Sequence, residues 1–226
     1  MRTLPNDRYM LDLPSRAVQR GYSGLQRVVP SAVAGPYHLT ISDERKFIWF
    51  RVAKVGTRTI TRHFDNQHVE ISAKEPSFVR YSPRLYSKYF KFAFVRNPWN
   101  RLVSCWHNKV LDSNYFGLEE SQLEHLKTFE NFVAWVEDNG MQHGDRHTQL
   151  QVELINLEDL DFLGRMESFG PDFAKVCERI GIEPDKVRPL NVSAERSSYR
   201  DYYTPELRNR VGCIYAADVD AFDYAF

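Results

Sequence analysis

The sequence predicts an α/β fold in which helices flank a central parallel sheet. Two short, almost continuously apolar runs, residues 46–53 and 89–96, have the pattern of strands that are covered on both faces. A segment with helical features follows each run, and a further strand and helix come later in the chain. Strands that alternate with helices in this order are typical of βαβ units.

The first helices are predicted from capping residues and apolar periodicity. Residues 57–65 can form a helix directly after the first strand. After the second strand, Asn97 is a good N-cap and Pro98 suits the first helical position. Residues 121–138 carry apolar side chains at helical spacing, so a third helix is expected there.

The later elements have equally clear ends. A third strand is expected around residues 160–165, and residues 171–180 form a helix that Gly181 can terminate as a C-cap. Thr204 is a suitable N-cap for a last helix over residues 205–217. In parallel sheets of this kind, ligands bind beyond the carboxyl ends of the strands. The residues at those ends are therefore the first candidates for a site.

Length and composition indicate one domain. The 226 residues suffice for a single sizeable core. Residues 41–226 are expected to form it, and residues 1–40 to be an irregular N-terminal wrap with a short helix near Ser15–Arg20. With 30 Lys and Arg against 30 Asp and Glu, the zero net charge argues against a general nucleic-acid binder, but it permits one local basic pocket.

No membrane span and no signal peptide are expected, because no apolar stretch approaches the roughly 18 residues that a span needs. The cysteines are odd in number and form no CxxC pair, so reduced structural cysteines in a cytoplasmic protein are predicted. No signal for an oligomeric state is present. The cysteines are Cys105, Cys177 and Cys213.

The first strand ends in a segment suited to holding a phosphate. It reads Lys54-Val55-Gly56-Thr57-Arg58-Thr59. The glycine lets backbone N–H groups turn toward one point, and the following helix adds its unpaired N–H groups. The GxxxxGK[ST] pattern of a Walker loop is absent. A plain strand-to-helix turn with a surface lysine is the alternative.

The second strand ends in Arg96, at the start of RNPWNRLVS. Asn97, Arg101, Ser104 and Asn108 follow at spacings of four, three and four, which predicts that they share one helix face. A polar stripe of this kind beside a strand end suits a second phosphate. A solvated helix face is the alternative reading of this stretch alone.

The two features together resemble the sulfotransferases that use 3′-phosphoadenosine 5′-phosphosulfate (PAPS), and most of all the family-2 carbohydrate group. Members of that group have a strand ending in Lys-x-Gly-Thr and an Arg-x-Pro segment leading to Arg-Leu-Val-Ser. The resemblance extends from about residue 40 to residue 226. It includes Gly164, Arg165 and Glu167 and the ending AFDYAF.

The resemblance implies a P-loop-like α/β domain and an enzyme that moves a sulfuryl group from PAPS to a hydroxyl or amine, on a glycan. It implies no metal. Many eukaryotic members of the family carry a membrane anchor and disulfides, which are not expected here, so this sequence resembles a bacterial, cytoplasmic version. The 5′-phosphosulfate would lie on the backbone of Val55, Gly56, Thr57, Arg58 and Thr59, and the side chains of the last three would contact it.

Other roles follow from the same resemblance. The catalytic Lys54 would stabilise the bridging oxygen of the donor. Arg96 and Ser104 would grip the 3′-phosphate, with Arg101 nearby. Arg196 is a candidate for a late basic loop that closes over the donor.

The general base is left open between several side chains. His147, in Asp145-Arg146-His147, resembles a histidine of the family's His-Trp segment, although Thr148 replaces the tryptophan. The other candidates are His107, His63 and Glu167. Loops over 66–88 and 110–125 are expected to shape the acceptor site, where Arg80, Arg84 and Lys88 are basic.

Two other functions remain compatible with these residues. One is a nucleotide kinase or NTPase with an atypical loop, which would depend on Mg²⁺. The other is a catalytically silent domain that binds adenosine 3′,5′-bisphosphate (PAP).

Overall fold

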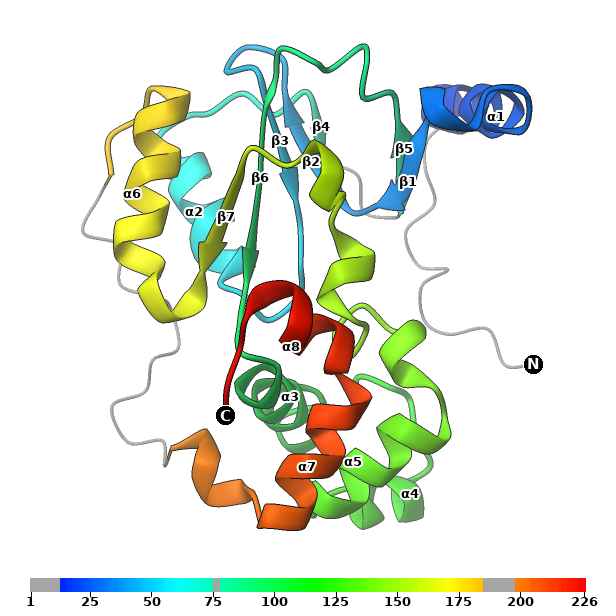
Figure 1. Ribbon diagram of the computed structural model, residues 1–226, viewed down its shortest axis with the longest axis vertical. Helices are drawn as coiled ribbons and strands as arrows, with labels where there is room; N and C mark the ends of the chain where they lie inside the picture. Colours follow the sequence, from blue (N-terminus) through cyan, green and yellow to red (C-terminus); the bar gives the residue numbers. More distant parts are fainter. Residues whose placement is uncertain (1–12, 75–77, 185–197) are drawn as a thin grey trace.

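The computed structural model describes residues 13–74, 78–184 and 198–226 (Figure 1). Its main sheet has five strands in the order β4-β2-β3-β6-β7. Strands β3 (Phe47–Phe50), β6 (Phe90–Val95) and β7 (Phe162–Arg165) are parallel, as the apolar runs predict. Their carboxyl ends therefore meet at one edge of the sheet.

The sheet is mixed rather than purely parallel, which corrects the prediction. Strand β2 (Leu39–Ser42) pairs antiparallel with β3, and β4 (Ala73–Lys74) pairs antiparallel with β2. Only residues 43–46 join β2 to β3. A connection this short permits a hairpin but no parallel crossover, which needs a dozen or more residues.

The N-terminal segment is more regular than predicted. Helix α1 spans Leu13–Val28, and β1 (Ala34–Tyr37) pairs with β5 (Val79–Tyr81) in a separate two-stranded sheet. Gln19 fixes α1 to this sheet, because its side-chain amide both donates to and accepts from the backbone of Arg80. A helix of 16 residues replaces the expected short one.

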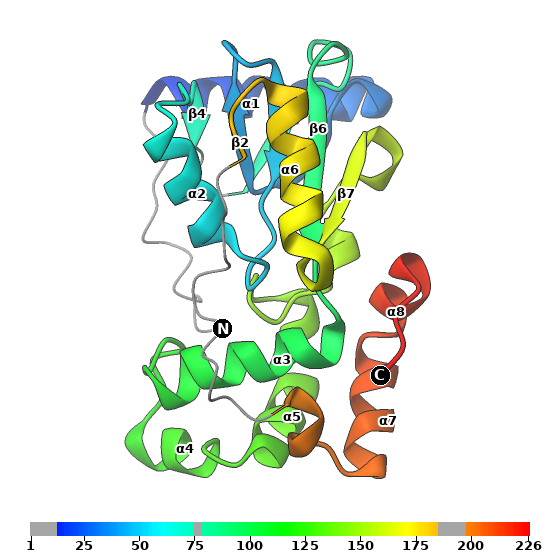
Figure 2. The ribbon, with the colours of Figure 1, turned by 90° about the vertical axis from the view of Figure 1, so that its left-hand side faces the viewer.

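Two groups of helices surround the main sheet. Helices α2 (Thr57–Asn66) and α6 (Phe169–Ile180) cover one face, whereas α1 lies on the other side (Figures 1 and 2). Below the carboxyl ends of the strands, α3 (Pro98–Trp106) runs across the sheet edge (Figure 2). The remaining helices gather around α3 and are α4 (Glu120–His125), α5 (Phe129–Asp138), α7 (Pro205–Ile214) and α8 (Ala216–Phe222).

Several predicted caps are confirmed. The Asn97 side chain accepts from the N–H groups of Trp99 and Asn100, Gly181 ends α6 with a φ of 68°, and Thr204 accepts from the N–H of Leu207. The helix predicted over 121–138 is instead two helices, because Thr128 caps α5 and interrupts the run. The last predicted helix is likewise divided into α7 and α8.

Two apolar clusters form the core. The first lies between the sheet, α2 and α6, and the second joins α3, α5 and α7. Within the described ranges, no helix is both long and apolar enough to cross a membrane. The same residues contain no cluster of His, Cys, Asp and Glu arranged to ligate a metal. Short helical turns complete the chain at Pro30–Ala32, His107–Leu111, Met141–His143, Gln151–Leu154, Leu157–Asp159, Met166–Ser168 and Tyr199–Tyr202.

Candidate active site

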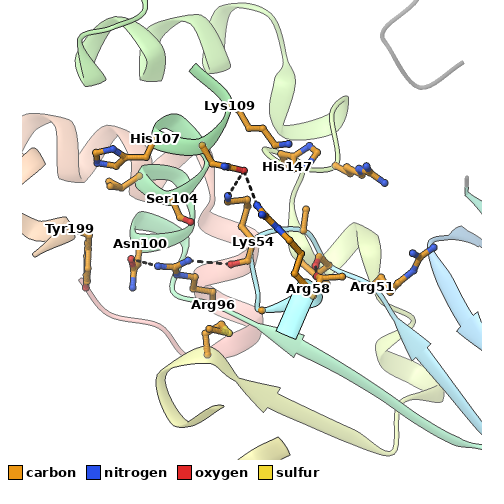
Figure 3. A pocket seen from close by; sticks show the side chains of 18 of the residues that line it. Arg51, Lys54, Arg58, Arg96, Asn100, Ser104, His107, Lys109, His147 and Tyr199 are labelled. Atoms are coloured by element: carbon orange, nitrogen blue, oxygen red, sulfur yellow. Dashed lines mark hydrogen bonds between the residues drawn. The ribbon is translucent and has the colours of Figure 1, made fainter. Parts of the chain in front are cut away.

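A cleft of about 690 Å³ opens between the carboxyl ends of β3 and β6 and the helices below them (Figure 3). The loop after β3, helix α3 and the segment around His147 all contribute to its walls. It thus lies where ligands are expected to bind in a fold of this class.

The cleft is strongly basic although the chain has no net charge. Six Lys and Arg side chains line it, against the carboxylates of Asp112 and Glu167. Such a concentration of one charge favours an anionic ligand. The six cations are Arg51, Lys54, Arg58, Arg96, Lys109 and Arg146.

The loop after β3 is built to present backbone N–H groups. Lys54 and Gly56 both have positive φ, 72° and 79°, which turns the chain sharply before α2. Gly56 is the N-cap of α2 and supplies no side-chain acceptor for the first-turn N–H groups. The backbone N–H groups at the start of a helix point toward its N-terminal end, where an anion can bind.

The position of Gly56 also leaves too little room for a side chain. A Cβ at this position would lie 3.0 Å from Sδ of Met166 and 3.1 Å from a ring carbon of Phe169. The loop therefore packs closely against the turn after β7.

Of the residues predicted to hold the donor through side chains, Thr57 lines the cleft, but its hydroxyl donates to Val52 O at 2.8 Å.

Val55 and Thr59 are buried, and neither side chain lines the cleft. Their expected contribution is therefore limited to the backbone. Arg58 lines the cleft and is exposed, with Nη2 3.5 Å from Oδ1 of Asn108.

Lys54 points into the cleft, where its Nζ donates to Oδ1 of Asn108 at 3.2 Å (Figure 3). Burial lowers the pKa of Lys54 to about 8, and the neighbouring Lys109, Arg96 and Arg58 contribute to this shift. An anion placed here would relieve the repulsion among these cations.

Arg96 lies at the end of β6 and reaches toward Lys54 from the other side (Figure 3). Its Nη1 donates to Lys54 O at 3.2 Å, and its Nη2 donates to Oδ1 of Asn100 at 2.8 Å. Ser104 lines the cleft one turn after Asn100. The structure thus brings the two predicted strand ends into one site.

Arg101 lies away from the cleft. It is 2% exposed and donates to three backbone carbonyls, those of Ala53, Gln149 and Arg146. Of the predicted stripe, Ser104 and Asn108 line the cleft, whereas Asn97 and Arg101 do not. Arg101 therefore holds the end of β3 and the segment before His147 together.

Replacing Arg101 by leucine is expected to destabilise the fold. Three half-buried carbonyls would lose their donor, at a cost of about 1 kcal/mol each, so the free energy of unfolding should fall by about 3 kcal/mol. For a domain of this size that lowers Tm by roughly 6–12 °C. Thermal unfolding followed by circular dichroism measures the change. Arg210→Leu, at an exposed ion pair with Glu137, is the matched control and should shift stability by less than about 1 kcal/mol.

Helix α3 continues into a π-helical turn, His107–Leu111, whose wider hydrogen bond joins Asp112 N to His107 O at 2.8 Å. The consecutive residues His107, Asn108 and Lys109 all line the cleft. Turns of this kind are frequent at functional sites. This one adds a histidine, an amide and a cation to the same wall.

His147 is held by Asp145. Its Nδ1 lies 2.9 Å from Asp145 Oδ1, and its backbone N–H donates to the same oxygen at 2.8 Å. With Nδ1 protonated toward this carboxylate, Nε2 carries the lone pair. Burial lowers the pKa of His147 to about 4 although Asp145 opposes the shift, so the ring is neutral at physiological pH. His147 lines the cleft and can accept a proton there.

The other candidate bases differ in position. His107 lines the cleft with its Nε2 3.1 Å from the Tyr202 hydroxyl. Glu167 also lines it, but its carboxylate accepts from Asn97 N and from the Tyr224 hydroxyl. His63 is buried against Glu183 O and does not line the cleft. Arg196 lies outside the described residues.

The cleft residues Asn100, Lys109 and Arg146 were not singled out from the sequence, and neither was Asp145, which holds His147 from the buried side. Asp145 had a local signal, because an Asp side chain can accept the backbone N–H of the residue two positions later in an Asx turn, here that of His147. Of the basic loop residues expected near an acceptor, Arg80 fixes α1 through Gln19 and Gln26 instead. Neither Arg84 nor Lys88 lines the cleft.

Comparison with known proteins identifies the relatives of this chain. The profile of the sulfotransferase family matches residues 37–225. An uncharacterized protein of Archaeoglobus fulgidus is 31% identical over 126 residues, which cover 54% of this chain and 91% of the relative. Carbohydrate sulfotransferase 14 of Danio rerio is 26% identical over 187 residues, 67% of this chain. The chain spans 50% of that relative's length.

No solved structure matches the chain significantly. The family profile, however, covers both strand ends and the whole of the cleft-forming region. The chain therefore belongs to the sulfotransferase family, in its family-2 group.

Proposed function

We propose that this protein transfers a sulfuryl group from PAPS to a hydroxyl, or an amine, of a glycan. The observation that carries the proposal is the convergence of Lys54, in the loop between β3 and α2, and Arg96 with Ser104 in one basic cleft. Two separate anion-binding elements fit a donor with two separate phosphate positions.

The residues present fit this donor. The backbone N–H groups at the start of α2, together with Lys54, would hold the 5′-phosphosulfate. Arg96 and Ser104 would hold the 3′-phosphate, and Asn100 already fixes the Arg96 guanidinium. We propose that Arg101 supports this arrangement by positioning the loop rather than by touching the phosphate.

PAPS supplies an activated sulfuryl group, whose sulfur gains a bond to the acceptor oxygen as its bond to the bridging phosphate oxygen breaks. Lys54 would donate to that bridging oxygen as negative charge builds on it. His147 Nε2 would take the proton of the attacking hydroxyl, and Asp145 would stabilise the resulting imidazolium. Positioning by the loop and α3 supplies much of the remaining rate enhancement.

The glycan acceptor is supported by the name of one relative, carbohydrate sulfotransferase 14 of Danio rerio. The nucleotide kinase reading has no Walker lysine-serine pair to support it. The silent PAP-binding domain is disfavoured by Lys54, because a purely binding site has no need of a buried lysine with a pKa of about 8. The cytoplasmic, bacterial setting stays a prediction.

Incubation with PAPS and a panel of oligosaccharides tests the function. Sulfated product and PAP, measured by mass spectrometry in equal amounts and without added Mg²⁺, are the expected result. Turnover of Mg·ATP in place of PAPS would support the kinase reading. PAP binding without transfer to any member of the panel would support the silent domain.

PAP affinity is expected to fall as the pH rises above about 8. Lys54 has a folded-state pKa of about 8, and bound phosphate favours its charged form. Below pH 8 the ammonium is already present, whereas above it binding must take up a proton, so Kd rises by up to about tenfold per pH unit. The phosphates themselves, with second pKa values near 6, no longer titrate there. Calorimetry between pH 6.5 and 9.5 measures the slope, which should flatten in Lys54→Met.

His147→Ala is expected to lower kcat by about 10²–10⁴-fold while leaving PAP affinity unchanged. Since the pKa of His147 is about 4, wild-type activity should persist on acidification until that pH is approached. Steady-state rates measured for His147→Ala, His107→Ala and Glu167→Gln compare the three candidate bases. A larger loss of kcat in either of the other two would assign the base there instead.

A further inference from the structure

Helix α1 is attached to the fold by polar residues and exposes its apolar ones. Gln19 bonds to the backbone of Arg80 in both directions, at 3.0 and 2.7 Å, and Oε1 of Gln26 accepts from Arg80 Nε at 2.7 Å. Val18, in contrast, is 55% exposed, and Leu25 is 43% exposed. A helix that only covers a fold normally turns its apolar residues inward. The apolar face of α1 is turned to the outside instead.

The exposed apolar side chains of the molecule gather around this helix. Of the seven large ones that are exposed in the described ranges, five belong to α1, to the residue that follows it or to the loop after β5. They are Val18, Leu25, Val28, Val29 and Leu85. Exposed apolar residues that gather in this way, with polar residues around them, mark an interaction surface.

The loop after β5 lies beside α1. Its Tyr86 packs against Tyr81 of β5 with ring centroids 6.3 Å apart, and burial raises the pKa of Tyr86 to about 12, with a contribution from the neighbouring Tyr22 of α1. Residues 13–37 and 79–89 are together called the α1 lobe here. Helices α1 and α4 lie at opposite ends of the molecule (Figures 1 and 2), and no residue of the α1 lobe lines the cleft.

The α1 lobe is basic, although the whole chain has no net charge. It contains six Lys and Arg residues and no Asp or Glu. Four of these cations are exposed, and within the described part of the chain no ion pair within 4.0 Å joins any of them to a carboxylate. They are Arg20, Arg27, Arg84 and Lys88. A surface that is both basic and apolar favours a partner that is both anionic and apolar.

Two carboxylates that border the α1 lobe are bonded to other groups. Asp43 accepts from the Tyr89 hydroxyl at 2.6 Å. Asp159 accepts from the Tyr81 hydroxyl at 2.7 Å and lies 3.3 Å from Nζ of the buried Lys91. The exposed cations of the lobe therefore keep their charge available to an external partner.

We propose that the α1 lobe binds the surface of a bilayer that contains anionic lipids. The apolar face of α1 and Leu85 would enter between the headgroups, and the exposed cations would contact the anionic groups of the lipids. Long arginine and lysine side chains can reach the headgroups while the apolar residues lie deeper. The chain would thus lie on the membrane rather than across it. Because the α1 lobe and the cleft share no residue, both can be occupied at once.

Flotation of the whole chain with lipid vesicles tests this inference, which goes beyond the proposed function and does not depend on it. Vesicles of phosphatidylcholine alone are compared with vesicles in which about a third of the lipid is phosphatidylserine. We expect binding to the anionic vesicles to be at least about tenfold tighter. Rising salt concentration should weaken it, because salt screens the attraction.

Two double variants separate the contributions of charge and apolar surface. Arg20→Gln with Arg27→Gln should weaken binding to the anionic vesicles roughly 30-fold, since each cation near an anionic surface contributes about fivefold. Val18→Ser with Val28→Ser should weaken it by at least about tenfold, because two apolar side chains no longer enter the bilayer. Both variants should keep the Tm and the PAP affinity of the wild type, since none of the four residues is buried or lines the cleft.

Matched control variants change the same kinds of residue elsewhere. Lys127→Gln with Arg210→Gln removes two exposed cations outside the α1 lobe, and Leu111→Ser removes an exposed apolar side chain outside it. Both should bind the anionic vesicles as the wild type does. An equal loss in these controls would show that net charge or general stickiness causes the binding, which contradicts the proposal.

Other outcomes would also overturn the inference. These are no binding to either kind of vesicle, equal binding to both, or binding that the serine variant leaves unchanged, since a contact with charge alone needs no apolar residues. A dimer that sedimentation velocity detects in the wild type and not in the serine variant would assign the surface to a second copy of the chain. Failure of the proposed function is distinguishable, because vesicle binding is measured without PAPS or acceptor.

Discussion

Lys54→Ala is expected to abolish most sulfuryl transfer while the protein stays folded. Removing one donor that faces charge developing in a transition state lowers kcat by about 10²–10³-fold. PAP should still bind, because the first-turn N–H groups of α2 and the Arg96 element remain. Initial rates of PAP release from PAPS, together with PAP affinity by calorimetry, separate the two effects.

The stability of this variant provides an internal check. The folded-state pKa of Lys54, about 8, lies below the ordinary lysine value of 10.5, so the folded state binds its proton less tightly than the unfolded state. Burial of the charged form therefore opposes folding at neutral pH, and stability gains from this group only as the pH rises above 8. Tm of Lys54→Ala at pH 7 should not fall. A large decrease in Tm with unchanged kcat would make Lys54 structural rather than catalytic.

Arg96→Ala is expected to remove the preference for a 3′-phosphate. Hydrogen bonds to charged groups contribute about 1.5–3 kcal/mol, so Kd for PAP should rise by about 10- to 100-fold. AMP lacks the 3′-phosphate and should bind the variant and the wild type equally. Titration of both nucleotides into both proteins measures the difference.

Arg96→Lys is the matched control, since it keeps the charge but loses the paired donors of the guanidinium. An intermediate Kd for PAP is expected. Arg96 also donates to Lys54 O, so its loss could disturb the loop as a whole. Equal weakening of PAP and AMP in Arg96→Ala would indicate such a disturbance and would contradict the 3′-phosphate role.

The sequence was sufficient to predict the convergence of the two strand ends. Continuous apolar runs mark β3 and β6 as buried parallel strands, and neighbouring parallel strands place their carboxyl ends together. Lys54 and Arg96 therefore had to meet. Cap residues such as Asn97 and Gly181 are local signals, so the helix ends they define are close to those observed.

Features set by distant contacts could not be predicted. Strand β2 contains Thr40 and Ser42, which are buried although polar, and Ser42 Oγ donates to Glu70 O from another segment. Helix α1 contains Gly21 and Gly24, which disfavour helix, so only its first part, near Ser15–Arg20, was predicted as helical. In each case residues far away in the sequence determine the conformation.

The residues of the site also differ in whether a local sequence pattern could predict their positions. The sequence predicted Arg101 on a polar helix face near the 3′-phosphate, yet it lies in the interior and donates to carbonyls from two distant segments. The π-helical turn that brings Lys109 to the cleft has no local sequence pattern either. The cations at the two strand ends, Lys54 and Arg96, were therefore predictable, whereas Lys109 was not.

The central claim is a site for a nucleotide with two separate phosphates, and thermal unfolding of the wild type with PAP, AMP and Mg·ATP tests it most directly. PAP at about 100 times its Kd should add about 2.7 kcal/mol of stability. For a domain of this size, Tm would rise by roughly 5–10 °C. The account predicts this shift with PAP and a much smaller one with AMP. No shift with PAP, or a shift only with Mg·ATP, would contradict it.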